Sequence, residues 1–161
     1  MKNYFEIFNL APNFTIDLNE IEKKYHQFQN QFHPDKADFN SIEHSILINE
    51  AYKILSDDFL RASHLLQLKN IDIEDDENQV KPDISTLQEI LDLQEKIFEI
   101  NNLAEILVLK NNLNSQIKKL IDDFHNAFAI NKFNEATQFL IKAKYLKKSL
   151  IDLKNRQKNL N

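Results

Sequence analysis

The feature that most restricts how this chain can fold is its complete lack of glycine. Tight turns, bulges and loops that closely approach a ligand depend on backbone conformations that glycine adopts most readily. The 161 residues also include only three prolines, so few positions interrupt a helix. Apolar residues recur at helical spacing, among many Leu, Lys, Glu and Gln residues that favour helices. We therefore predict an all-α fold.

The missing residue types also argue against several kinds of site. P-loops and dinucleotide-binding loops need glycine, and a chain without cysteine forms no disulfide and offers no thiolate to zinc or an iron-sulfur cluster. We expect no bound cofactor.

No apolar run approaches the roughly 18 residues of a membrane span, and the segment MKNYFEIFNL lacks the features of a signal peptide. We expect no membrane association and a cytoplasmic location. The compartment would be the cytosol of a bacterium or, alternatively, the interior of an organelle.

Charge divides the chain into two parts of opposite sign. Residues 1–77 contain 7 basic and 15 acidic side chains, whereas residues 78–161 contain 13 basic and 10 acidic ones. Such asymmetry indicates separate modules, and the net charge of −5 argues against nucleic acid as the main partner. We predict an N-terminal module over residues 1–70, an acidic linker over residues 71–83 and a C-terminal module over residues 84–161.

Each module is predicted to be a small helical assembly. In the first, a short aromatic helix ends before Pro12, and a second helix begins with Asp17 as its cap and runs to Phe32. A third helix over residues 42–55 can pack against the second as an antiparallel hairpin, followed by a short helix over residues 60–68. In the second module, three longer helices over about residues 84–101, 103–130 and 134–158 should form an antiparallel bundle.

The tripeptide His33-Pro34-Asp35, at the tip of the predicted hairpin, has the chemistry of a docking point. Pro34 presets the backbone and reduces the entropy lost on binding. Asp35 can accept a guanidinium group, and His33 can donate a hydrogen bond from either ring nitrogen. The alternative is an ordinary turn in which Asp35 caps the next segment. The flanking helices favour the docking interpretation.

This arrangement resembles the J-domain over residues 1–68. The resemblance is carried by the tripeptide between two helices, by the aromatic pattern Tyr-Phe-x-x-Phe-x-Leu that starts at Tyr4, and by the pattern Asn-x-Ala-Tyr-x-x-Leu that starts at Asn49. It implies that His33, Pro34 and Asp35 contact the ATPase of a DnaK-type chaperone and promote ATP hydrolysis there. The protein would then be an activator and not an enzyme.

J-domains also present a basic face on their second helix, and the resemblance places Lys23, Lys24 and Lys36 in the matching region. The match is incomplete, because His26, Gln27 and Gln31 stand where basic residues are common in the family. We therefore expect weak electrostatic steering toward the chaperone. The alternative for Lys23 and Lys24 is an ordinary solvated helix face.

A J-domain followed by an acidic connector and a three-helix bundle resembles the HscB family of co-chaperones, which serves iron-sulfur cluster biogenesis. Generic J-proteins carry Gly/Phe-rich and Cys-rich segments that this composition does not allow. The segment from Arg61 to Leu66 and residues 87–95 add to the resemblance, which covers the whole chain. It implies HscA, a specialised chaperone ATPase, as one partner. It implies an IscU-type iron-sulfur scaffold, delivered for cluster assembly or transfer, as the other.

The resemblance also assigns a scaffold-binding surface to the C-terminal bundle. Its apolar contacts fall at Leu87 and Leu91, its acidic contacts at Asp92 and Glu95, and its aromatic contact at Tyr145. We expect Lys144 and Leu146, the neighbours of Tyr145, to lie beside this surface. The alternative is that Leu87 and Leu91 belong to the bundle core, for which the neighbouring Ile90 and Leu93 compete.

Two other functions are weighed against this one. The first is a small metal-dependent hydrolase, whose candidate ligands would be His26, His33, Asp35, His44 and either His64 or His125. The scattered spacing of these residues argues against it, because the chain has no His-Glu-x-x-His pattern. The second is a J-protein for an unrelated client, which would share the first module and differ in the second.

Overall fold

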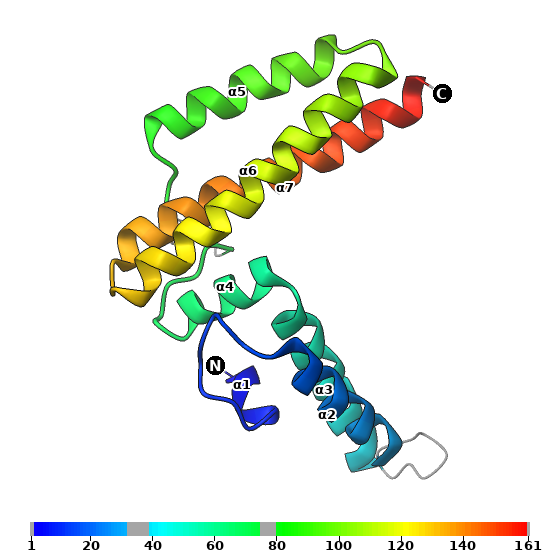
Figure 1. The fold of residues 1–161 in the computed structure, drawn as a ribbon, viewed down its shortest axis with the longest axis vertical. Coiled ribbons are helices and arrows are strands. Elements are labelled where there is room, and N and C mark those ends of the chain that lie inside the picture. Colours follow the sequence, from blue (N-terminus) through cyan, green and yellow to red (C-terminus); the bar gives the residue numbers. More distant parts are fainter. Residues whose placement is uncertain (1, 32–38, 75–79, 161) are drawn as a thin grey trace. The chain divides into compact units, whose positions relative to one another are not determined.

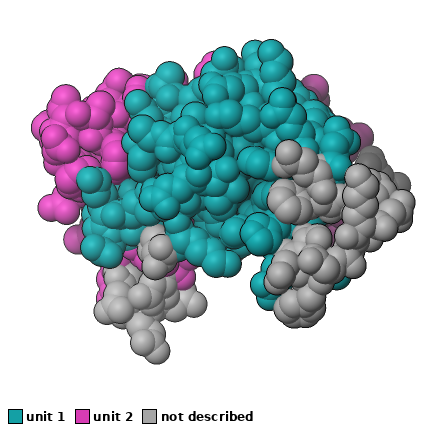
Figure 2. Space-filling view, turned by 90° about the horizontal axis from the view of Figure 1, so that it is seen from below, with its two compact units in different colours: residues 1–71 teal, residues 72–161 magenta. Residues whose placement is uncertain are grey.

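The computed structural model describes residues 2–31, 39–74 and 80–160. All regular secondary structure in these ranges is helical, which confirms the all-α prediction, and the helix ends lie within three residues of the expected bounds. The chain separates into two compact units, Met1–Ile71 and Asp72–Asn161, coloured separately in Figure 2. The helices, labelled in Figure 1, are α1 (Tyr4–Ile7), α2 (Leu18–Gln31), α3 (Phe39–Ser56), α4 (Asp58–Gln67), α5 (Ile84–Glu99), α6 (Leu103–Ala129) and α7 (Phe133–Leu160).

In the first unit, α2 and α3 form the predicted antiparallel hairpin, and both α1 and α4 pack against α3. Asp17 caps α2 as expected, because its Oδ1 atom accepts a hydrogen bond from the backbone N–H of Asn19 at 2.9 Å. On α2, the apolar side chain of Ile21 is buried, whereas that of Leu18 in the first turn is 46% exposed. The core side chains include Phe5, Phe8, Ile21, Ile48, Ala51, Leu55, Leu65 and Leu66.

In the second unit, α7 packs along both α6 and α5. The core side chains of α6 and α7 include Leu113, Ile117, Phe124, Ala136, Leu140, Ala143 and Leu153, whereas Leu120, Phe128, Phe133 and Leu150 are half-buried. Side-chain oxygens cap the helices, since Asp83 accepts from the backbone of Thr86 at 2.7 Å and Asn102 accepts from that of Glu105 at 2.9 Å. None of the helices in the described ranges is both long and apolar enough to cross a bilayer.

Asparagine takes the place of glycine where a helix must end in a left-handed residue. Asn9, Asn70 and Asn131 have φ angles of 52°, 61° and 61°, and asparagine tolerates this region better than most residues. After each of them, a backbone N–H bonds to the carbonyl five residues earlier, from Leu10 to Phe5 at 2.9 Å, from Ile71 to Leu66 at 3.0 Å and from Lys132 to Ala127 at 3.0 Å. This closure is typical of helix C-termini, and it explains how the chain turns without glycine.

Candidate protein-binding sites

The hairpin of α2 and α3 carries the candidate chaperone site on the segment between its helices. His33, Pro34, Asp35 and Lys36 lie outside the described residues, so the geometry concerns the hairpin alone. Asn49 on α3 braces α2, because its Oδ1 accepts hydrogen bonds from Tyr25 Oη at 2.9 Å and from Gln29 Nε2 at 2.7 Å. The rings of Tyr25 and Tyr52 stack with centroids 4.1 Å apart. Asn49 and Tyr52 of the J-domain pattern therefore join the two helices.

The two lysines expected on the basic face have different environments. The Nζ atom of Lys24 donates to the carbonyl oxygen of Phe8 at 2.7 Å and pairs with Glu20 Oε1 at 2.7 Å, and the side chain is 26% exposed. The ammonium group of Lys24 therefore links α2 to the C-terminal end of α1. Lys23 is exposed, and it forms no ion pair with any residue that the structure describes. Of this pair, Lys23 presents its charge to solvent.

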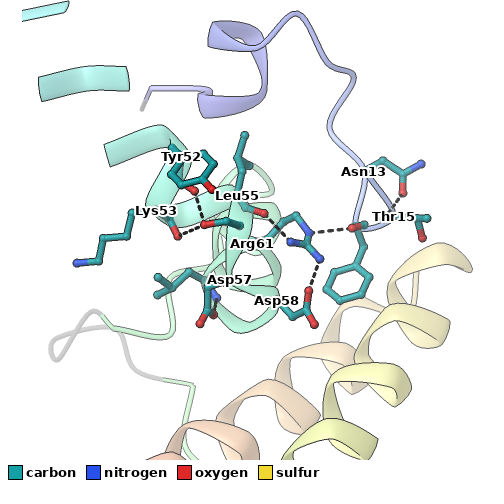
Figure 3. A network of polar contacts seen from close by, with 11 residues as sticks. Asn13, Thr15, Tyr52, Lys53, Leu55, Asp57, Asp58 and Arg61 are labelled. Carbon is teal, nitrogen blue, oxygen red and sulfur yellow. Dashed lines mark hydrogen bonds and ion pairs between the residues drawn. The ribbon is translucent and has the colours of Figure 1, made fainter. Parts of the chain in front are cut away.

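Arg61 joins three segments of the first unit, as Figure 3 shows. Its Nε atom donates to the carbonyl oxygen of Phe14 at 2.8 Å, its Nη1 atom donates to that of Leu55 at 2.5 Å, and its Nη2 atom pairs with Asp58. The guanidinium also lies over the Phe14 ring, 4.9 Å from the centroid. Because Arg61 is only 4% exposed, these contacts compensate the burial of its charge. These contacts indicate that Arg61 stabilises the fold of the first unit.

The candidate scaffold surface lies on α5, and the structure places its leucines in solvent. Leu87 is 43% exposed and Leu91 is 56% exposed, whereas Ile90 is 7% exposed and faces the bundle. Asp92 and Glu95 are exposed as well. The alternative that Leu87 and Leu91 fill the bundle core is therefore wrong.

The α7 side of this surface differs in part from the expectation. Tyr145 is half-buried, but Leu146 is 4% exposed and belongs to the core, so the expectation that it flanks the surface is wrong. Lys144 is fastened to the chain before α5, since its Nζ donates to the carbonyl oxygen of Ile73 at 2.8 Å and pairs with Glu74 at 2.9 Å. These are tertiary contacts between residues far apart in the sequence, and helical periodicity does not reveal them.

An ion pair shows which parts of α7 and α5 lie side by side. Lys142 Nζ lies 2.5 Å from Glu89 Oε2. Glu89 stands between Leu87 and Leu91, and Tyr145 follows Lys142 by about one helical turn. The pair therefore places Tyr145 on the part of α7 that runs beside the exposed leucines. The five residues proposed from the sequence thus come from neighbouring stretches of two helices.

The histidines proposed for the hydrolase alternative do not gather in the part of the chain that the structure describes. No group of three or more His, Asp or Glu side chains in these ranges is arranged to hold a metal ion. His64 is buried, and its Nε2 atom accepts a hydrogen bond from the backbone N–H of Tyr4 at 3.2 Å. His33 and Asp35 lie outside the described residues.

Comparison with known proteins gives two family matches and several relatives that align with most of this chain. The DnaJ domain family matches residues 3–64, and the HSCB C-terminal oligomerisation domain family matches residues 82–154. The iron-sulfur cluster co-chaperone protein HscB of Mus musculus is 28% identical over 151 residues, which are 89% of this chain. The chain spans only 64% of that mouse protein.

Two further similarities cover a larger share of both aligned proteins. The co-chaperone protein HscB homolog of Acinetobacter baylyi is 32% identical over 153 residues, which are 94% of this chain and 88% of that protein. The crystal structure of human co-chaperone protein HscB superposes with a TM-score of 0.86 at 27% identity, over 98% of this chain and 83% of that one. Both domain families therefore occur here in one chain that aligns with HscB proteins almost from end to end. The chain belongs to the HscB family of co-chaperones.

Proposed function

We propose that this protein activates the ATPase of a DnaK-type chaperone of the HscA class and delivers an IscU-type iron-sulfur scaffold to it. The observation that carries the proposal is the succession of a DnaJ domain match and an HscB C-terminal match, each on a compact unit with its own candidate surface. A regulator of this kind needs no catalytic residues of its own, because the ATP site belongs to the partner. We propose that the activity takes place in the cytoplasm.

Activation through the first unit follows from differential binding. A docked protein accelerates hydrolysis only if it binds more tightly to the hydrolysis-competent state of the chaperone than to the resting state. In this proposal His33, Pro34 and Asp35 make that contact, supported by the hairpin that Asn49 braces. The free charge of Lys23 attracts the acidic surface of the chaperone and contributes mainly to the association rate. Lys36 would extend this basic region beyond the tripeptide.

Delivery through the second unit uses an apolar centre with a charged rim. The exposed Leu87 and Leu91 supply the apolar contact, and the carboxylates of Asp92 and Glu95 lie along its edge. Interfaces of this pattern gain most of their affinity from a few desolvated apolar or aromatic side chains, while the charges select the partner. Tyr145 on α7 would add an aromatic contact at the other edge.

Capture of the purified scaffold by variants of this chain tests the delivery function. We expect Leu91→Ala and Tyr145→Ala each to weaken capture about tenfold, as truncation of a central interface residue commonly does. The matched control is Ile151→Ala, because Ile151 is an apolar residue of α7 that is 62% exposed and lies away from α5 in the helical register.

The outcomes separate the proposed function from its alternatives. Equal capture by Leu91→Ala, Tyr145→Ala and the control would reject the surface. A wild-type chain that stimulates the chaperone but does not capture the scaffold would indicate a J-protein with an unrelated client. Capture by the wild type that is lost in the two variants and kept in the control supports delivery of the scaffold.

A further inference from the structure

The exposed apolar residues of α5 form a stripe that is longer than the proposed scaffold contact. In addition to Leu87 and Leu91, Ile84 is 86% exposed and Phe98 is 79% exposed. Intervals of three, four and seven residues place all four on one face of the helix. We call this face the α5 stripe. With a rise of 1.5 Å per residue, it extends about 21 Å from Ile84 to Phe98.

A different face of α5 packs against the bundle. Thr86, Ile90 and Ile97 are buried, and α5 packs against α7. The α5 stripe is therefore not the side of the helix that stabilises the bundle. A phenylalanine that is 79% exposed leaves a large apolar surface in water, and contiguous surface of this kind commonly marks a site of protein contact.

An acidic rim follows one edge of the α5 stripe. It consists of Asp92, Glu95 and Glu99, which are exposed and spaced three and four residues apart. None of these carboxylates is ion-paired with a residue in the described ranges, although Asp92 accepts a hydrogen bond from Gln88 Nε2 at 2.8 Å. Glu89, by contrast, is neutralised by Lys142. The uncompensated charge of the rim complements a partner with basic side chains.

At the Phe98 end, the α5 stripe borders a groove between α5 and α7. The groove has a volume of about 420 Å³, and Gln94 and Phe98 line it from α5 while Asp152 and Asn155 line it from α7. Arg156 also lines it, with its Nε bonded to the carbonyl oxygen of Ile100 at 2.9 Å. The groove thus offers one apolar wall and an acidic group beside it. A partner side chain that contacts Phe98 can enter it.

We infer that the scaffold is bound along the whole α5 stripe, with Phe98 as a second apolar anchor in addition to Leu91. The contacting segment of the scaffold carries apolar side chains flanked on one side by lysine or arginine, which face the acidic rim. This inference rests on the proposed delivery function. It lengthens a contact that otherwise runs from Leu87 to Glu95 by slightly less than one helical turn at each end, to Ile84 and to Phe98. Two separated anchors fix the direction in which the partner segment lies on α5.

Isothermal titration of the full chain with the purified IscU-type scaffold tests the inference. Phe98→Ala should raise the Kd about tenfold, the same effect as expected for Leu91→Ala, because each removes an anchor. The control is Val108→Ala, since Val108 is an apolar residue of α6 that is 69% exposed and lies outside the stripe. It should change the Kd less than about twofold. Raising the salt concentration from about 0.05 to about 0.5 M should weaken wild-type binding, because it screens the acidic rim.

Each other outcome overturns the inference in a recognisable way. If Leu91→Ala weakens binding while Phe98→Ala behaves like the control, the contact ends near Glu95 and the proposed function stands without the extension. If the wild-type chain does not bind the scaffold, both the inference and the delivery function fall. The helix content of Phe98→Ala should equal that of wild type, and a loss of helix would show that Phe98 stabilises the bundle and is not an anchor.

Discussion

His64 is a buried histidine that joins the first helix of the chain to α4. It is 2% exposed, its Nε2 atom accepts the backbone N–H of Tyr4 at 3.2 Å, and its ring stacks on Phe5 with centroids 5.8 Å apart. Burial lowers the pKa of His64 below its ordinary value of 6.5, and the Gln67 side chain opposes this shift only in part. Burial and the Glu50 carboxylate raise the pKa of Tyr4 to about 12, so this neighbour stays neutral. His64 is therefore neutral in the folded protein at neutral pH.

Acidification should consequently destabilise the first unit. The unfolded histidine binds a proton more readily than the folded one, so the stabilisation is complete above pH 6.5 and is lost as the pH falls toward the lower folded pKa. The urea-unfolding midpoint should be lower at about pH 5.5 than at about pH 7.5.

The variant His64→Gln tests this role. It should be less stable than wild type at the higher pH, and its stability should fall less on acidification. An equal pH-dependent loss in wild type and variant would contradict this role. Tyrosine fluorescence can follow unfolding, because three of the four tyrosines, Tyr4, Tyr25 and Tyr52, lie in the first unit.

Sequence patterns predict some single-residue roles and miss others for a physical reason. The cap at Asp17 is local, since its acceptor and donor are two residues apart, and such caps have a recognisable signature. Arg61, Lys24 and Lys144 instead donate to backbone carbonyls that lie 47, 16 and 71 residues away. A carbonyl acceptor is present in every residue. Nothing in the sequence therefore marks which carbonyl a distant cation will reach.

At the scale of single helices, α2 carries two adjacent lysines in different environments. We expect Lys23→Ala to reduce stimulation of the chaperone ATPase at low salt and to leave the melting temperature unchanged, because Lys23 is exposed. Lys24→Ala should instead destabilise the first unit by roughly 1 kcal/mol, because the Phe8 carbonyl and Glu20 lose their common partner. Steady-state ATPase rates and thermal unfolding of both variants separate the two effects. If Lys24→Ala were as stable as wild type and defective in stimulation, the assignment would be reversed.

The helices themselves follow from the sequence, but the orientation of α5 does not. Apolar spacing, caps and prolines predict the seven helices of the described ranges, because each of these signals is local. On α5 the same spacing produces two apolar faces, one through Ile90 and Ile97 and the other through Leu91 and Phe98. Periodicity alone does not decide which face is buried, because that depends on where α7 packs. The structure makes this choice and leaves the α5 stripe exposed.

At the scale of the whole molecule, one chain links two surfaces that would bind different proteins. The candidate chaperone site belongs to the acidic first unit and the α5 stripe to the second. A scaffold bound to the second unit is held at a high effective concentration near a chaperone bound to the first, even if the two surfaces do not influence each other. In the proposed function, the tripeptide contacts the ATPase partner and the second unit selects the client.

The measurement that tests this account most directly is the steady-state rate of ATP hydrolysis by an HscA-type chaperone in the presence of the scaffold. Wild-type protein should raise the rate, and His33→Gln should lose this effect while it still captures the scaffold, because the substitution leaves the second unit unchanged. No stimulation by the wild type, or equal stimulation by His33→Gln, would contradict the co-chaperone function assigned to the tripeptide.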